Sequence, residues 1–195
     1  MFLETICIMN GKVQNEQAHT ARMQQTAAAH RFTAPPLPDL EKMLPAALTA
    51  GRVKCRIIYH HTLEEVSFVP YQPKMITSLR LVEASPDYAF KYADRTTLLD
   101  LLRLKGDCDE ILITRDGLIT DTSYSNVVLS KGVRFYTPHS FLLNGTKRQQ
   151  LLRSGSISER DIRAASLGEY DRIYLINAML DIEDEVSLPL SSIYP

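Results

Sequence analysis

The sequence predicts an α+β protein, and three observations lead to this expectation. Strand-like apolar runs fill residues 110–138, where Asp116-Gly117 and Lys131-Gly132 are typical of hairpin turns. A stretch rich in Ala and Gln over residues 16–32 indicates a helix. Three further strand-like runs lie between these regions, at residues 52–60, 65–71 and 75–83. Together they favour an antiparallel sheet with helices on one side.

Composition excludes several functional classes. The 195 residues carry a net charge of −1, with 22 basic and 23 acidic residues mixed along the chain, so we expect no nucleic-acid partner. No apolar run approaches the roughly 20 residues of a membrane helix, and the N-terminus does not resemble a secretory signal. The 3 cysteines are odd in number and widely spaced, which favours a reducing, cytoplasmic compartment.

The remaining elements of the first half follow from local signals. The run 2–9 predicts a strand, and Asn10-Gly11 a tight turn after it. Asp39 predicts the cap of a helix over residues 40–48, which Pro45 interrupts.

In the second half, Asp94 predicts the cap of a leucine-rich helix that Gly106 ends. Ser156 and Glu159 form a capping box that predicts another short helix. The apolar run 173–179 predicts a buried strand that ends in a turn.

A polar patch interrupts the hairpin region. Thr120 to Asn126 are seven hydrogen-bonding side chains in a row, where a purely structural strand would alternate with apolar residues. Asp121 is its single carboxylate, and a buried carboxylate framed by hydroxyls and an amide suits a polar ligand because buried charge must be paired. An irregular, solvated strand end is the alternative.

Other candidate residues carry weak signals when taken alone. His19 and Arg22 are neighbours on one helix face, as many surface pairs are. Lys91 stands just before a helix, and Gly145 opens one whose first N–H groups could bind an anion. His60-His61 has no further ligand at metal-binding spacing, so we interpret it as a hairpin tip and expect no metal site.

The order of five motifs is similar to that of a known family. GLITDTSYSN (117–126) resembles the signature of the class IV aminotransferase family, the fold-type IV pyridoxal 5'-phosphate (PLP) enzymes. This family includes branched-chain and D-amino-acid aminotransferases and 4-amino-4-deoxychorismate lyase. Further segments resemble its motifs in the expected order: FLETI with HTARM, KYADR, LLNGTKR and the strand that ends in Asn177-Ala178.

The resemblance implies roles for individual residues. Lys91 would form the Schiff base with PLP and act as the catalytic acid and base. Asp121 would pair with the pyridine nitrogen, and Arg22 would bind the phosphate opposite the amides that open the 146–152 helix. The cofactor-binding residues so implied are Arg22, Lys91, Asp121, Ser125, Asn126, Gly145, Thr146 and Lys147, and the substrate-binding residues are Asn177, Ala178 and Met179.

The family also implies an architecture. We expect the D-amino-acid aminotransferase-like fold of two small α/β domains, with a shortened N-terminal domain (1–84) and a C-terminal domain (85–195) that carries the Schiff-base lysine. PLP would lie between them, and the family resemblance implies a homodimer. Two residues depart from the family pattern, since Asp121 stands where Glu is common and Asp94 where the lyases usually carry Asn.

The Asn177-Ala178 turn is more similar to that of the lyases than to the Gly-Thr-Ala turn of the branched-chain enzymes. The resemblance therefore implies a lyase that releases 4-aminobenzoate and pyruvate from a small amino substrate, 4-amino-4-deoxychorismate. Two alternatives stay open, an aminotransferase for a D- or branched-chain amino acid and a PLP-binding homologue without turnover.

Overall fold

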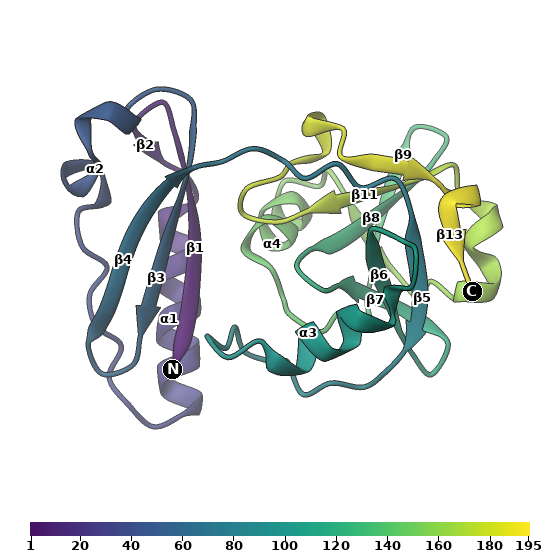
Figure 1. The fold of residues 1–195 in the computed structure, drawn as a ribbon, viewed down its shortest axis with the longest axis horizontal. Coiled ribbons are helices and arrows are strands. Elements are labelled where there is room, and N and C mark those ends of the chain that lie inside the picture. The colour runs from purple at the N-terminus through teal and green to yellow at the C-terminus, as the bar shows by residue number, and fades with distance from the viewer. The chain divides into compact units, whose positions relative to one another are not determined.

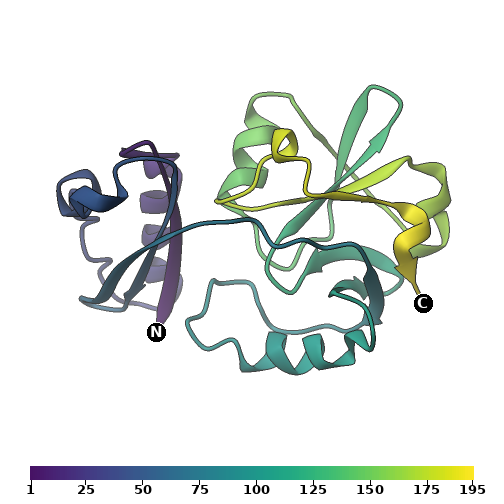
Figure 2. The same cartoon turned by 45° about the horizontal axis from the view of Figure 1, so that its top comes forward.

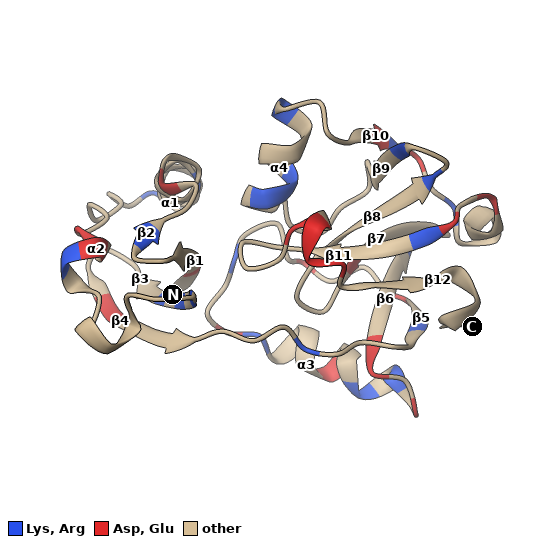
Figure 3. Ribbon diagram, turned by 90° about the horizontal axis from the view of Figure 1, so that it is seen from above, with Lys and Arg blue, Asp and Glu red and all other residues tan.

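The protein, seen as a computed structural model that describes residues 1–195, divides into two compact units (Figure 1). Unit 1 comprises residues 1–72 and 90–94, and unit 2 comprises residues 73–89 and 95–195. Acidic and basic residues are interspersed along both units (Figure 3). None of the helices combines the length and the apolar character that crossing a bilayer requires.

This division differs from the expected boundary after residue 84. Residues 79–83 form a strand of the unit 2 sheet, so they separate from the strands that precede them. The segment with Lys91 groups with unit 1 because its backbone is bonded to the N-terminal strand. The chain thus crosses from unit 1 to unit 2, returns briefly at residues 90–94, and crosses again.

Unit 1 is a four-stranded antiparallel sheet with strand order β2-β1-β3-β4 and a long helix, α1, running along it (Figure 1). The pleat of β3 explains its core face, because every second residue from Val53 to Tyr59 is buried. The elements are β1 (Phe2–Met9), β2 (Lys12–Val13), α1 (Glu16–Ala29), α2 (Leu40–Met43), β3 (Arg52–Tyr59) and β4 (Leu63–Pro70).

Local signals in unit 1 are largely confirmed. Asp39 caps α2 by accepting from the N–H of Lys42 at 3.1 Å, and the α-helix stops before Pro45, as expected. A 3-10 turn (Ala46–Leu48) follows. Helix α1 ends at Ala29, three residues before the expected end.

Unit 2 contains a nine-stranded mixed sheet (Figure 2). The strands are β5 (Leu79–Glu83), β6 (Glu110–Arg115), β7 (Leu118–Thr122), β8 (Asn126–Lys131), β9 (Arg134–Pro138), β10 (Ser158–Arg160), β11 (Arg172–Ile176), β12 (Ser187–Pro189) and β13 (Ile193–Tyr194). Its α-helices are α3 (Thr96–Leu102) and α4 (Thr146–Arg153). Short 3-10 helices cover Arg103–Lys105, Ala164–Glu169, Ile182–Asp184 and Leu190–Ser192.

The hairpin turns of unit 2 are confirmed. Asp116 and Gly117 both have positive φ, of 54° and 73°, which a two-residue turn between β6 and β7 requires. Gly132, with φ of 59°, turns the chain from β8 to β9. Buried apolar residues of β6, β7, β8 and β11 form the main core, among them Leu112, Ile119, Val127, Leu129, Ile173 and Leu175.

Three expectations about unit 2 are wrong. Strand β5 does not join an antiparallel sheet with the preceding strands but runs parallel to β6, which the crossover through α3 permits. Helix α3 has Arg95, not Asp94, at its N-cap. Ser156 and Glu159 cap no helix, because residues 158–160 pair as a strand with β9.

Candidate active site

A buried ion-pair cluster lies beneath α1 in unit 1. Glu4 shares one face of β1 with the core residues Ile6 and Ile8, and its side chain is 1% exposed. Arg22 grips it with two hydrogen bonds, Nε to Oε1 at 2.8 Å and Nη2 to Oε2 at 2.5 Å. His19 Nδ1 lies 2.7 Å from the same Oε2. The two helix residues are therefore not a surface pair but part of the core.

The cluster keeps Glu4 ionised. Burial alone would raise the pKa of Glu4, but the Arg22 charge and the hydrogen bonds from His19 and Arg22 outweigh burial and lower it to about 2. Burial lowers the pKa of His19, with the charges of Arg22 and Lys91 acting in the same direction against its bond to Glu4. The cluster is thus a carboxylate–guanidinium pair beside an imidazole whose protonation burial opposes.

Lys91 is anchored to the same unit through its backbone. The N–H of Leu3 donates to the carbonyl of Lys91 at 2.8 Å, and the rings of Phe2 and Tyr92 lie 5.6 Å apart. Because its charge acts on His19, the Lys91 ammonium belongs to the surroundings of the Glu4 cluster. The fold therefore brings Lys91 and Arg22, which are distant in sequence, to one part of unit 1.

Asp121 is the second buried carboxylate, on β7 in unit 2. It is 5% exposed, and its Oδ2 accepts from the N–H groups of Leu142 and Leu143 at 3.0 and 2.9 Å. The Asn126 side chain donates to Oδ1 at 2.8 Å and also to the carbonyl of Leu143. Burial raises the pKa of Asp121 to about 6, although these bonds and the Arg148 charge act in the opposite direction. The bonds from the loop amides and Asn126 thus favour the ionised form of Asp121, against the effect of burial.

Gly145 lies against Asn126 where α4 begins. A Cβ atom on Gly145 would lie 2.1 Å from Asn126 Oδ1, a distance that real contacts do not reach. Its φ of −63° is open to any residue, so close approach rather than conformation requires glycine here. The start of α4, the amide of Asn126 and the carboxylate of Asp121 therefore form one packed unit.

The side chains that follow Gly145 are buried or paired with other residues of unit 2. Thr146 is buried at the first position of α4. Lys147 Nζ lies 2.5 Å from Asp181 Oδ2, so its ammonium is paired while its backbone N–H remains in the first turn of the helix. Ser125 shares a hydroxyl hydrogen bond of 2.7 Å with Thr122 in the turn between β7 and β8.

The turn after β11 is built by Asn177. Asn177 and Leu180 exchange backbone hydrogen bonds, and the Asn177 side chain accepts from the N–H of Met179 at 2.8 Å. The Met179 amide is therefore used within the turn, which leaves the Ala178 amide as the stronger candidate for an external anion.

The predicted site residues thus form two groups. Arg22 and Lys91 lie in unit 1, and the other predicted residues lie in unit 2, where Asp121, Asn126 and Gly145 are in direct contact. Ser125 and Lys147 are close by in sequence, but their side chains bond to other partners. The cofactor and substrate roles of all these residues remain predictions.

Sequence reasoning assigned no role to four features of the site. Glu4 is the one charged residue in a mostly apolar strand, and that pattern is a signal that could have found it. Arg148 follows Gly145 by three residues and was part of the motif. The amides of Leu142 and Leu143 and the partner role of His19 carry no sequence signal, because they depend on the tertiary fold.

Comparison with known proteins identifies the family. A family model described as Amino-transferase class IV matches residues 1–183. A protein of Haemophilus influenzae named only as uncharacterized is 35% identical over 180 residues, which cover 90% of this chain and 96% of its own. Both findings confirm the resemblance drawn from the motifs.

Solved structures agree on the fold. A crystal structure from Haemophilus somnus, of a protein with the provisional name 4-amino-4-deoxychorismate lyase, has a TM-score of 0.81 at 35% identity and covers 91% of this chain and 95% of its own. The PLP-bound form of a hypothetical aminotransferase from Mycobacterium tuberculosis has a TM-score of 0.76 at 18% identity, covering 98% and 80%. The chain has the fold-type IV architecture and belongs to the class IV aminotransferase family of enzymes.

Proposed function

We propose that the protein is a PLP-dependent lyase that converts 4-amino-4-deoxychorismate into 4-aminobenzoate and pyruvate. Two observations support this choice among the reactions of the family. The Haemophilus somnus protein with the provisional lyase name is 35% identical along almost the whole chain. The turn after β11 is built by Asn177, the residue of the lyase-like Asn-Ala motif.

The environment of Asp121 is the observation that carries the PLP assignment. A carboxylate that is buried and bonded by three N–H groups is a fixed acceptor for a positively charged partner. A protonated pyridine nitrogen is such a partner, and the Asp121 charge would hold the proton on it. The residues present therefore fit PLP.

The phosphate has two candidate anchors. Arg22 donates to Glu4 through Nε and Nη2, and the same guanidinium would hold the phosphate. The first-turn N–H groups of α4, at Thr146 and Lys147, would supply the second anchor together with the helix dipole.

Lys91 would hold the cofactor through its side-chain amine and then serve as the acid and base. When bound, PLP supplies an electron sink for the electron pair that remains after a proton is removed. The Lys91 amine would take the proton from the ring carbon that bears the substrate amino group. The enolpyruvyl C–O bond then breaks, its side chain gains a proton and leaves as pyruvate, and the ring becomes aromatic.

The Ala178 amide would orient a substrate carboxylate. Its neighbour Met179 already donates to Asn177, so the turn is rigid and presents a defined backbone surface.

Product analysis tests the proposal. The PLP-loaded protein would be incubated with 4-amino-4-deoxychorismate, and separately with a panel of D- and L-amino acids and a 2-oxo acid acceptor. We expect equal amounts of 4-aminobenzoate and pyruvate, with none from a Lys91→Ala control. Amino-group exchange on the panel without 4-aminobenzoate would identify an aminotransferase instead, and no product from either would support a homologue without turnover.

A further inference from the structure

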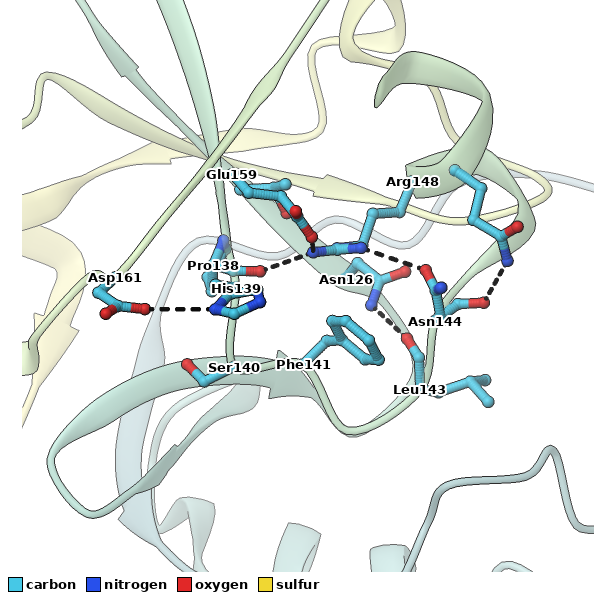
Figure 4. A network of polar contacts seen from close by, with 12 residues as sticks. Asn126, Pro138, His139, Ser140, Phe141, Leu143, Asn144, Arg148, Glu159 and Asp161 are labelled. Atoms are coloured by element: carbon cyan, nitrogen blue, oxygen red, sulfur yellow. Dashed lines mark hydrogen bonds and ion pairs between the residues drawn. The ribbon is translucent and has the colours of Figure 1, made fainter. Parts of the chain in front are cut away.

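A buried arginine of α4 lies at the centre of a polar network in unit 2 (Figure 4). The Arg148 guanidinium donates to the carbonyl of Pro138 at 2.9 Å, to Asn144 Oδ1 at 3.1 Å and to Glu159 Oε1 at 2.6 Å. Its carbon Cζ also lies 4.3 Å from the centre of the Phe141 ring. Three of these four partners belong to the start, middle and end of one connection.

That connection is the β9–α4 loop, residues 138–145. It runs from the last residue of β9 to the residue before α4, and Arg148 contacts it at Pro138, Phe141 and Asn144. A planar guanidinium with donors in fixed directions can hold such separated points in one arrangement, which a flexible ammonium cannot. The loop therefore takes its shape from Arg148.

The same loop supplies the bonds to Asp121. Leu142 and Leu143 lie between the residues that Arg148 contacts, and their N–H groups donate to Asp121 Oδ2. Asn126 links β7 to the β9–α4 loop, because its amide donates both to Asp121 Oδ1 and to the Leu143 carbonyl. Any shift of the loop moves two of the three donors that the carboxylate has.

The burial of Arg148 indicates a specific role. The residue is 1% exposed, and its Nε is buried without a hydrogen-bond partner. A buried cation with an unsatisfied donor is costly, so it contributes little as a simple stabiliser. We therefore look for its role in the loop conformation that its hydrogen bonds fix.

We propose that Arg148 is a positioning residue for Asp121, which sets the β9–α4 loop so that its two amides hold the carboxylate in its ionised form. The functional meaning of this role rests on the proposed function, in which Asp121 faces the pyridine nitrogen. The positioning itself is a property of the protein alone.

The electrostatics of Asp121 support this inference. Burial raises its pKa to about 6, and the Leu142 and Leu143 amides, the Asn126 amide and the Arg148 charge all act to lower it. Arg148 is the charged group among these, and the others are neutral donors. Because the loop amides lower the pKa, losing them would raise the pKa of Asp121 further.

The test is the titration of Asp121 in the full-length protein without PLP. The chemical shift of the Asp121 carboxyl carbon would be followed by 13C NMR against pH and assigned with Asp121→Asn. Arg148→Lys keeps the positive charge but loses the planar guanidinium with its fixed donor directions. Arg148→Met loses both the charge and the guanidinium. Arg160→Lys is the matched control, because Arg160 is an exposed arginine of the same unit that stacks on Tyr136 instead.

We expect Arg148→Lys to raise the titration midpoint of the Asp121 carboxyl group by about one pH unit. This is a tenfold gain in proton affinity, as expected for a lost amide hydrogen bond. Arg160→Lys should leave it unchanged. A folded Arg148→Lys protein with the wild-type titration would overturn the proposal. A rise in Arg148→Met alone would also overturn it, because the effect would then come from charge and not from position.

A milder variant covers the case in which Arg148→Lys does not fold. Asn144 is exposed, so Asn144→Ala removes one contact between loop and guanidinium without opening the core. It should raise the titration in the same direction by a smaller amount, and no rise would count against the proposal. Because the measurement needs no cofactor, a failure of the proposed lyase activity would not alter its result.

Discussion

At the scale of single residues, Glu4 is a buried carboxylate held by two side chains of α1. A carboxylate with no exposure persists in a core only when its charge is compensated, and Arg22 and His19 supply the compensation. The bidentate geometry also fixes the Arg22 guanidinium in one orientation.

The loss of folding stability at low pH should reveal the contribution of the Glu4–Arg22 ion pair. The pKa of Glu4 is lowered from 4.5 to about 2, so its contribution is complete above pH 4.5 and is lost as pH falls toward 2. The lost contribution is about 3 kcal/mol. Urea unfolding followed by circular dichroism between pH 5 and 2 should therefore show a smaller loss of stability in Glu4→Gln than in the wild type.

Glu64→Gln is the control for this measurement, because Glu64 is an exposed glutamate of the same unit. Its pH dependence should match that of the wild type. If Glu4→Gln loses stability with acid as steeply as the wild type, Glu4 is not held ionised by Arg22 in the folded state.

At the scale of elements, the start of α4 and the start of β8 fit together only because Gly145 lacks a side chain. The Asn126 amide fills the space that a Cβ would need. Since Asn126 in turn bonds to Asp121, a change at the helix start should reach the carboxylate on β7.

Gly145→Ala tests this contact. Overpacking of a filled site costs about 1–3 kcal/mol, so we expect a loss of that order in the free energy of unfolding. Gly168→Ala is the matched control, because nothing lies within 4 Å of a Cβ there and its φ is not positive. Equal stability of the two variants would show that Asn126 can move away at no cost.

The same scale explains which elements the sequence could predict. The turns at Asp116-Gly117 and Gly132 were predictable because positive φ restricts residue choice locally. The partner of β5 was not, because pairing with β6 depends on a crossover through α3. Ser156 and Glu159 matched a capping box by spacing, yet Glu159 bonds to Arg148, and tertiary contacts decided its structure.

At the scale of the whole molecule, the family was predictable because five short motifs occur in a fixed order. The grouping of Lys91 with Arg22 was not, because it results from a brief return of the chain to unit 1. The contacts that Glu4, His19 and Arg148 make could not be predicted either, although Glu4 and Arg148 lie within the quoted motifs FLETI and LLNGTKR. Each acts through a partner that lies far away in sequence or in a loop.

We propose that Lys91 carries the cofactor, and covalent labelling tests this role most directly. The purified protein would be loaded with PLP, treated with borohydride, digested and analysed by mass spectrometry. We expect PLP to be fixed on the peptide with Lys91 and to be absent from that position in Lys91→Ala. Label on Lys147, the other lysine of a site motif, or a protein that retains no PLP, would contradict the account.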